Sequence, residues 1–503
     1  MTDAIGQLRG RMATLVDLRT INQLLEWDQQ TMMPPQGVQT RAESLATLQR
    51  IRHEMFVSDD VGRLLEAAAS ELNGEPPDSD DAALVRVTRR RWEKARKVPS
   101  ELAGEIARAA SVGQKEWISA RANSDFASFV GRLERNYELA RRYVDCFDGF
   151  DCAYDVLLDD YEPGMKTAEV ARLFSELKAE LTPMIAQIAA HADRVDDSIL
   201  HGSFPIDQQR RLTVDVIERM GFNRAAWRLD DAVHPFATGL GAHDVRITTR
   251  WDESYFASSL YGSMHECGHG LYEAGVDKSL QRTPLGFGES LALHESQSRL
   301  WENMVGRSHE FSNVLAPAIS RIFGDAARGV DRETLYRAVN KIEPSFIRVE
   351  ADELTYGLHI VLRFELEQEL IEGRLAVRDL PEAWNARFKE YLGLDVPDDA
   401  RGVLQDVHWA SGLIGYFSTY ALGNLIAGQL WRQAHVDLPD LDHQIEAGEL
   451  TGLREWLRAN VHRYGSKYSS RELLQRVVGG PIEVAPFVDY LKQKLGAVYG
   501  LDL

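Results

Sequence analysis

Cysteine is scarce in this chain: only Cys146, Cys152 and Cys267 occur among 503 residues. An odd number this small offers no disulfide framework and is typical of a protein in a reducing compartment. The N-terminus, MTDAIGQLRGRM, lacks the apolar stretch of a secretory signal. We therefore expect a cytoplasmic protein.

Uncharged stretches are also few, and one of them is long enough to consider as a membrane span. Residues 409–431 contain no charged side chain, and a span needs about 20 apolar residues. This stretch, however, carries several glycines and the polar residues Ser411, Ser418, Thr419, Asn424 and Gln429. We predict a buried helix here and no membrane partner.

Positive charge is in deficit, since the formal net charge is -20. A surface this acidic argues against nucleic acid or an anionic membrane as the main partner. Hydrophobic residues make up 44% of the chain and charged residues 27%, which is usual for a globular protein. Neither internal repeats nor a clear linker divide the sequence, so we expect one domain over residues 1–503.

Helical spacing of apolar residues covers almost the whole chain. The predicted helices are 5–30, 40–72, one or two between Ala82 and Phe150, 167–195, 205–221, 310–328, 332–342, 350–373 and much of the C-terminal third. One segment alternates instead: HDVRITTRW (243–251) reads as a half-buried strand, with 232–241 as its hairpin partner. Pro235 favours an edge position for that partner. The sequence thus predicts a mainly α protein with a small antiparallel β-sheet.

A metal-binding motif lies within a helical pattern at His265-Glu266-Cys267-Gly268-His269. Residues four apart share one face of a helix, so both imidazoles can reach one Zn²⁺. Glu266 stays beside the metal, where it can take a proton from water. Imidazole and carboxylate ligands would also accept Co²⁺ or Mn²⁺.

A catalytic zinc needs a third protein ligand and an open coordination position. The following helical segment, 286–304, offers Glu289, His294, Glu295 and Glu302. Its distance from His269 is long enough for a turn and a returning helix. The residues alone leave Glu295 and His294 as nearly equal candidates.

Several separated motifs then occur in one order. They are His234-Pro235-Phe236, Asp244-Val245-Arg246-Ile247-Thr248, His265-Glu266-x-x-His269, His294-Glu295-Ser296-Gln297-Ser298-Arg299, Ile347-Arg348-x-x-Ala351-Asp352 and Gly402-x-x-Gln405-Asp406-x-His408-Trp409. Because it carries these motifs in this order, the chain resembles the thermostable carboxypeptidase (Taq) family of zinc metallocarboxypeptidases, a gluzincin-like group with the HExxH motif.

The resemblance implies a large helical metallopeptidase fold related to angiotensin-converting enzyme and neurolysin. It implies a deep groove with the metal on its floor, a homodimer, and removal of C-terminal residues from peptides with broad specificity. We expect a helical lid region at about 1–150 and a catalytic core at about 200–503.

The resemblance also selects site residues. It makes Glu295 the third metal ligand beside His265 and His269, with Glu266 as general base. By similarity to angiotensin-converting enzyme, His408 and a nearby tyrosine face the metal. We favour Tyr420 for the oxyanion and Tyr416 near the substrate carboxylate.

An exopeptidase must recognise a free carboxylate, which the planar fork of arginine does well. The resemblance assigns this role to Arg246 and Arg348. His234 would hydrogen-bond the substrate backbone beside the edge strand, where a peptide can add as another strand.

Three other interpretations remain open. The first is an endopeptidase or oligopeptidase of the same fold, with identical metal chemistry. The second is a helical binding protein whose HExxH is accidental. The third is another zinc-dependent hydrolysis, such as removal of an acyl group. Cleavage of amidated peptides and the metal content of the protein would separate them.

Overall fold

The structure of the protein, a computed structural model, describes residues 3–288 and 290–503. Its α-helices are α1 (Ala4–Thr31), α2 (Val38–Phe56), α3 (Asp59–Glu71), α4 (Asp80–Lys97), α5 (Ser100–Asn123), α6 (Val130–Val144), α7 (Ala153–Leu158), α8 (Thr167–Ala189), α9 (Ile206–Met220), α10 (Phe256–Gly275), α11 (Leu291–Arg299), α12 (His309–Phe323), α13 (Arg332–Val339), α14 (Tyr356–Ile371), α15 (Leu380–Leu392), α16 (Ser418–Asp437), α17 (Leu441–Ala447), α18 (Thr451–Asn460), α19 (Ser470–Val477) and α20 (Ala485–Tyr499).

Shorter helical turns join these elements. They are η1 (Pro35–Gly37), η2 (Ala192–Arg194), η3 (Ser198–Leu200), η4 (Lys278–Leu280), η5 (Leu300–Val305), η6 (Gly324–Ala327), η7 (Arg348–Glu350), η8 (Val377–Asp379) and η9 (His462–Tyr464). Of these, η5 is a π-helix that directly continues α11. Such π-helical insertions occur frequently at functional sites.

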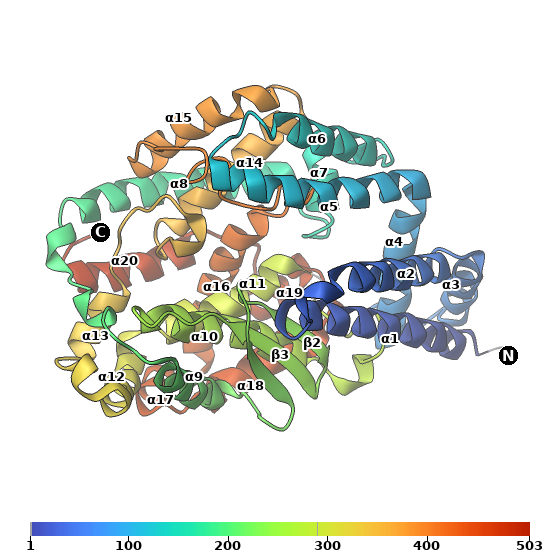
Figure 1. The fold of residues 1–503 in the computed structure, drawn as a ribbon. Coiled ribbons are helices and arrows are strands. Elements are labelled where there is room, and N and C mark those ends of the chain that lie inside the picture. Colours follow the sequence, from blue (N-terminus) through green and yellow to red (C-terminus); the bar gives the residue numbers. More distant parts are fainter. Residues whose placement is uncertain (1–2, 289) are drawn as a thin grey trace.

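Figure 1 shows the helices in two groups. Helices α5, α6, α7, α8, α14 and α15 lie in the upper part of the view, and α9, α10, α12, α17 and α18 lie with the sheet in the lower part. Helices α11 and α16 lie between them and pack against each other. Helices α11 and α16, which carry residues of the site described below, therefore have neighbours from both groups.

The mainly α architecture confirms the prediction, but the chain between 82 and 150 forms three helices rather than one or two. The first break comes from Pro99. The residue before it, Val98, is extended (ψ 118°) and ends α4, because a proline disfavours the helical conformation of its predecessor. The second break follows Ser124, whose left-handed conformation (φ 52°) ends α5.

The sheet is mixed, and the prediction of an antiparallel sheet is wrong in one pairing. Strands β2 (Ala237–Gly241) and β3 (Asp244–Thr249) pair antiparallel as expected. A strand that the alternation did not reveal, β1 (Trp227–Asp231), pairs parallel with β3, so that β3 is central. The strand β2 lies at an edge, as Pro235 indicates, and α10 packs against β2 and β3.

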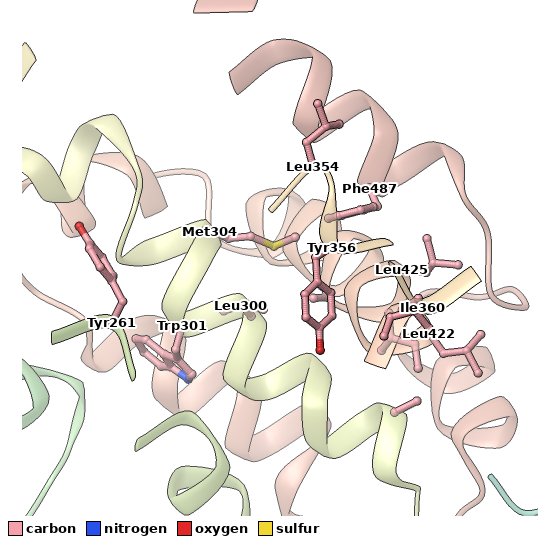
Figure 2. Close-up of a cluster of buried hydrophobic side chains, with 14 of the residues drawn as sticks. Tyr261, Leu300, Trp301, Met304, Leu354, Tyr356, Ile360, Leu422, Leu425 and Phe487 are labelled. Carbon is pink, nitrogen blue, oxygen red and sulfur yellow. The ribbon is translucent and has the colours of Figure 1, made fainter. Parts of the chain in front are cut away.

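A continuous apolar core supports the centre of the molecule. Figure 2 shows part of it, where η5 supplies Leu300, Trp301 and Met304 beside Tyr356 of α14 and Leu422 of α16. Each of these side chains is at most 4% exposed. This packing holds α11, α14 and α16 in fixed positions relative to one another.

The uncharged segment 409–431 is mostly buried, as predicted, but residues 409–417 form turns rather than the predicted helix, because Gly412 and Gly415 adopt positive φ angles of 72° and 93°. Its second half belongs to α16, and most of the side chains of that helix are buried. Within residues 3–288 and 290–503, none of the helices has the length and apolar character needed to cross a membrane.

Candidate metal centre and active site

Two imidazoles lie one helical turn apart on α10. The Nε2 atoms of His265 and His269 are 3.2 Å apart, and the two rings are nearly perpendicular. Both face the same side of the helix, which is what the four-residue spacing predicts.

The third candidate ligand, the carboxylate of Glu295, comes from α11. The Oε2 atom of Glu295 lies 3.7 Å from Nε2 of His265 and 3.5 Å from Nε2 of His269. Ligands at about 2.0–2.1 Å from a tetrahedral zinc are about 3.4 Å apart. The three donor atoms therefore fit one divalent cation without rearrangement, and together they form the candidate metal site.

Two of the other candidates, Glu302 and His294, occupy different places. Glu302 contacts Nδ1 of His265 and His294 contacts Nδ1 of His269, so both lie behind the imidazoles rather than among the donor atoms. Glu289 lies outside the described residues. The geometry thus separates Glu295 from His294, which the sequence could not do without the family resemblance.

Two glycines let α11 approach closely enough for Glu295 to reach the histidines. A Cβ at Gly268 of α10 would lie 2.8 Å from the carbonyl oxygen of Gln297 and from Cα of Ser298. A Cβ at Gly423 of α16 would lie 2.7 Å from Cβ of Glu295. Only glycine fits at these contacts, so the site depends on small residues in both neighbouring helices.

Hydrogen bonds behind the site orient His265. The Nδ1–H of His265 donates to Glu302 at 2.9 Å, which leaves Nε2 free to bind a metal. Glu302 also accepts from Arg299 (3.3 Å) and Arg307 (3.2 Å). Arg299 in turn donates to Oε1 of Glu295 at 2.7 Å, so one arginine holds both carboxylates.

The protonation states of Glu295 and His269 suit metal binding. Burial opposes ionisation of Glu295, but the charges of Arg299 and His265 outweigh it and keep the pKa well below its usual range. Burial lowers the pKa of His269 to about 3, so this imidazole is neutral near pH 7. For His265, burial acts in the same direction, but the carboxylates of Glu295 and Glu302 outweigh it and raise the pKa. The same negative charge favours a bound cation.

Glu266 is buried beside the candidate metal site. Its side chain is 7% exposed, and burial raises its pKa to about 7 although His265 acts in the opposite direction. A carboxyl group with a pKa near the working pH is suited to take up a proton and pass it on.

His408, in the motif at residues 402–409, contacts Tyr420 at the start of α16. The hydroxyl of Tyr420 lies 3.3 Å from Nε2 of His408, and the rings of Tyr416 and Tyr420 contact each other edge to face. Burial lowers the pKa of His408 to about 3, so its ring is neutral near pH 7. Burial raises the pKa of Tyr416 to about 12 and also raises the pKa of Tyr420, so both keep their hydroxyl protons.

Arg348 lies in a buried ionic cluster that the sequence did not predict. It donates to Oδ1 of Asp406 at 2.8 and 3.1 Å, and Arg363 donates to the other carboxylate oxygen. A third bond from Arg348 reaches the hydroxyl of Tyr356 at 2.9 Å. The Tyr356 ring in turn lies beneath the guanidinium of Arg299, 4.3 Å from its centroid. Arg348 is therefore connected through Tyr356 to the arginine that holds Glu295.

Arg246 and His234 lie at the sheet rather than in this cluster. Arg246 pairs with Asp244 on β3, and the ring of Trp27 from α1 covers its guanidinium at 4.2 Å. His234 is exposed in the segment before β2. Among the described residues, the hydrogen bonds and ion pairs of Arg246 do not involve His265, His269 or Glu295.

The sequence offered Glu302 only as a candidate ligand and gave Arg299, Tyr356 and Asp406 no role behind the donor atoms. Arg299 and Glu302 follow Glu295 at helical spacing, a pattern that could have placed them on the same face. Tyr356 and Asp406 come from distant segments, and no local pattern connects them to the site.

Comparison with known proteins identifies the family. Residues 7–495 match the sequence profile of the Carboxypeptidase Taq (M32) metallopeptidase family. The chain is 41% identical to Thermostable carboxypeptidase 1 of Thermus thermophilus over 492 residues, covering 96% of each protein. It is 36% identical to Carboxypeptidase 1 of Bacillus subtilis over 476 residues, covering 95% of each.

A solved structure agrees with this assignment. The M32 carboxypeptidase of Deinococcus radiodurans R1 superposes with a TM-score of 0.96 at 38% identity, over 99% of this chain and all of that one. The chain belongs to the M32 family of metallocarboxypeptidases and is a peptidase.

Proposed function

We propose that the protein removes single C-terminal residues from peptides, with broad tolerance of side chains, using one zinc ion held by His265, His269 and Glu295. The fit of three donor atoms 3.2–3.7 Å apart to one cation carries the proposal. When bound, the ion supplies a Lewis acid that activates water and polarises the scissile carbonyl. Cobalt or manganese could replace zinc, since the ligand types accept all three.

Side chains of the protein then carry out proton transfer, stabilisation of the oxyanion and contact with the substrate. Glu266 takes a proton from the attacking water and delivers it to the nitrogen of the departing residue. The hydroxyl of Tyr420 donates to the carbonyl oxygen as negative charge develops on it. His408, neutral and within 3.3 Å of that hydroxyl, orients it. Tyr416 lies beside Tyr420 and would contact the substrate near its carboxylate.

Arg348 is well placed to bind the terminal carboxylate. A guanidinium has five N–H donors, and three hydrogen bonds to Asp406 and Tyr356 leave two for a substrate. The guanidinium carbon of Arg348 lies 4.8 Å from the centroid of the Tyr420 ring, so Arg348 is next to the proposed oxyanion donor. A carboxylate held here would present the last peptide bond to the metal.

The sheet supplies a second part of the substrate site in this proposal. A peptide would run in a groove along the edge strand β2, with His234 bonding its backbone and Arg246 closing one end. The edge position of β2 supports this arrangement, because an edge strand can pair with an added strand.

The packing of the first helices supports a proposal for the domain organisation. The apolar side chains of α1, α3 and α4 form a cluster of their own, together with residues between Val276 and Leu285. We propose that residues 1–150 act as a lid over a catalytic core at 200–503, within one domain.

The family resemblance supports a homodimer, for which light scattering should give twice the 56.7 kDa of one chain. The three free cysteines support a cytoplasmic location.

Paired substrates test the proposed function. A peptide with a free C-terminal carboxylate should lose residues one at a time, whereas the same peptide as its C-terminal amide should resist cleavage. Equal cleavage of both, or internal cuts, would instead identify an endopeptidase of the same fold.

A further inference from the structure

Behind His269, on the side away from the candidate metal, two more groups form a chain. The Nδ1 atom of His269 lies 2.5 Å from Nδ1 of His294, and Nε2 of His294 lies 2.8 Å from Oε1 of Glu273. Glu273 is four residues beyond His269 on α10, so His265, His269 and Glu273 share one helix face. The ring of His294 from α11 lies between the last two.

The direction of each hydrogen bond follows from the carboxylate. A carboxylate can only accept, so Nε2 of His294 carries a proton and donates it to Glu273. The other nitrogen of a neutral His294, Nδ1, must then accept from Nδ1–H of His269. His269 is thereby left with its Nε2 lone pair, which faces His265 and Glu295.

Packing holds the side chains of His294 and Glu273 in place. The ring of His294 contacts the rings of His269 and Tyr272 at centroid distances of 4.6 and 5.2 Å. Strand β2 lies directly against Glu273, since a Cβ at Gly239 would come within 2.8 Å of the Cβ of Glu273. The side chain of Glu273 is therefore confined between β2 and the ring of His294.

We propose that Glu273, acting through His294, is a positioning residue that fixes the orientation and tautomer of the metal ligand His269. The two histidine ligands would then be supported differently: His265 donates directly to Glu302, whereas His269 reaches its carboxylate through a second imidazole. Partners of this kind strengthen metal binding by typically 10- to 100-fold. The inference rests on the proposed metal site.

The zinc affinity of the metal-free protein tests the hydrogen bonds from His269 through His294 to Glu273 without relying on turnover. Competition with a chromophoric chelator gives the dissociation constant, and the visible absorption of the Co²⁺-loaded protein reports ligand geometry. We expect Glu273→Ala to weaken zinc binding by about 10- to 100-fold and to change the Co²⁺ spectrum. Glu273→Gln keeps an acceptor oxygen for His294 and should restore most of the affinity. Glu333→Ala, which removes the carboxylate partner of His309, is the matched control and should bind zinc as the wild type does.

A second variant covers the case in which Glu273→Ala fails to fold. His294→Phe keeps a ring but removes both nitrogens, and it should weaken zinc binding at least as much. Adding Glu273→Gln to His294→Phe should then cause no further loss of zinc affinity, because His294→Phe already removes the hydrogen bonds that connect Glu273 to His269. Wild-type affinity and an unchanged Co²⁺ spectrum in Glu273→Ala or His294→Phe would overturn the positioning role. A wild-type protein that binds no zinc would instead contradict the proposed function itself.

Discussion

A single methyl group at Gly268 should disturb the metal site through the backbone. Its carbon would lie 2.8 Å from the carbonyl oxygen of Gln297 and Cα of Ser298, where ordinary contacts begin at 3.4 Å. Backbone atoms cannot rotate out of the way, so in Gly268→Ala the helices α10 and α11 must separate by about 0.6 Å. Metal–ligand distances tolerate deviations of only about 0.2 Å. Because α11 carries Glu295, we expect zinc to bind at least ~10-fold more weakly, a loss of about 1.4 kcal/mol.

The stability of metal-free Gly268→Ala should fall by about 0–2 kcal/mol. Overpacking costs about 1–3 kcal/mol, and the better helix propensity of alanine returns about 1 kcal/mol. Gly262→Ala is the matched control, because it lies on the same helix and a Cβ there meets nothing within 4 Å. That variant should gain up to about 1 kcal/mol and keep wild-type zinc affinity.

Chelator competition and urea unfolding of the metal-free proteins measure the two effects separately. Gly268→Ala should differ from Gly262→Ala in both. Equal zinc affinity in the two variants would show that α11 does not need the close approach at Gly268.

Three further outcomes follow from the site. Glu266→Gln should retain zinc but lose about 10²–10⁴-fold in kcat, since the group that moves the proton is gone; retained turnover would remove Glu266 from the mechanism. Arg348→Ala should lower kcat/KM on free-acid peptides by about 10- to 100-fold, from loss of charge-assisted hydrogen bonds, with little change in zinc content; unchanged kinetics would exclude the carboxylate role. In the metal-free protein, burial raises the pKa of Glu266 from 4.5 to about 7, so the folded state binds this proton more tightly than the unfolded chain. That stabilisation is present below pH 4.5 and is lost as pH rises to 7, so wild type should lose about 3 kcal/mol relative to Glu266→Gln over this range in urea unfolding; parallel pH profiles would contradict the raised pKa.

Local patterns predicted the parts of the molecule that depend on neighbouring residues. The four-residue spacing of His265 and His269 sufficed to bring their Nε2 atoms together, because helix geometry alone sets that distance. The alternation over 243–251 predicted β3, because successive side chains of a strand point to opposite faces of the sheet. Glu295 needed the family resemblance, since its approach depends on how α11 packs against two other helices.

Long-range pairings were not visible in the sequence. Strand β1 pairs parallel with β3 and carries no clear alternation, so nothing local marked it as part of the sheet. The bond between His294 and Glu273 and the cluster around Asp406 join segments whose contact is decided only by the packed core. The break before Pro99, in contrast, was readable from the residue type and was missed.

X-ray diffraction from zinc-loaded crystals, with data collected on both sides of the zinc absorption edge, would locate the cation directly. We predict one anomalous peak per chain at about 2.0–2.2 Å from Nε2 of His265, Nε2 of His269 and a carboxylate oxygen of Glu295. A peak bound instead by His294 or Glu302, or the lack of a peak between α10 and α11, would contradict the proposed metal centre.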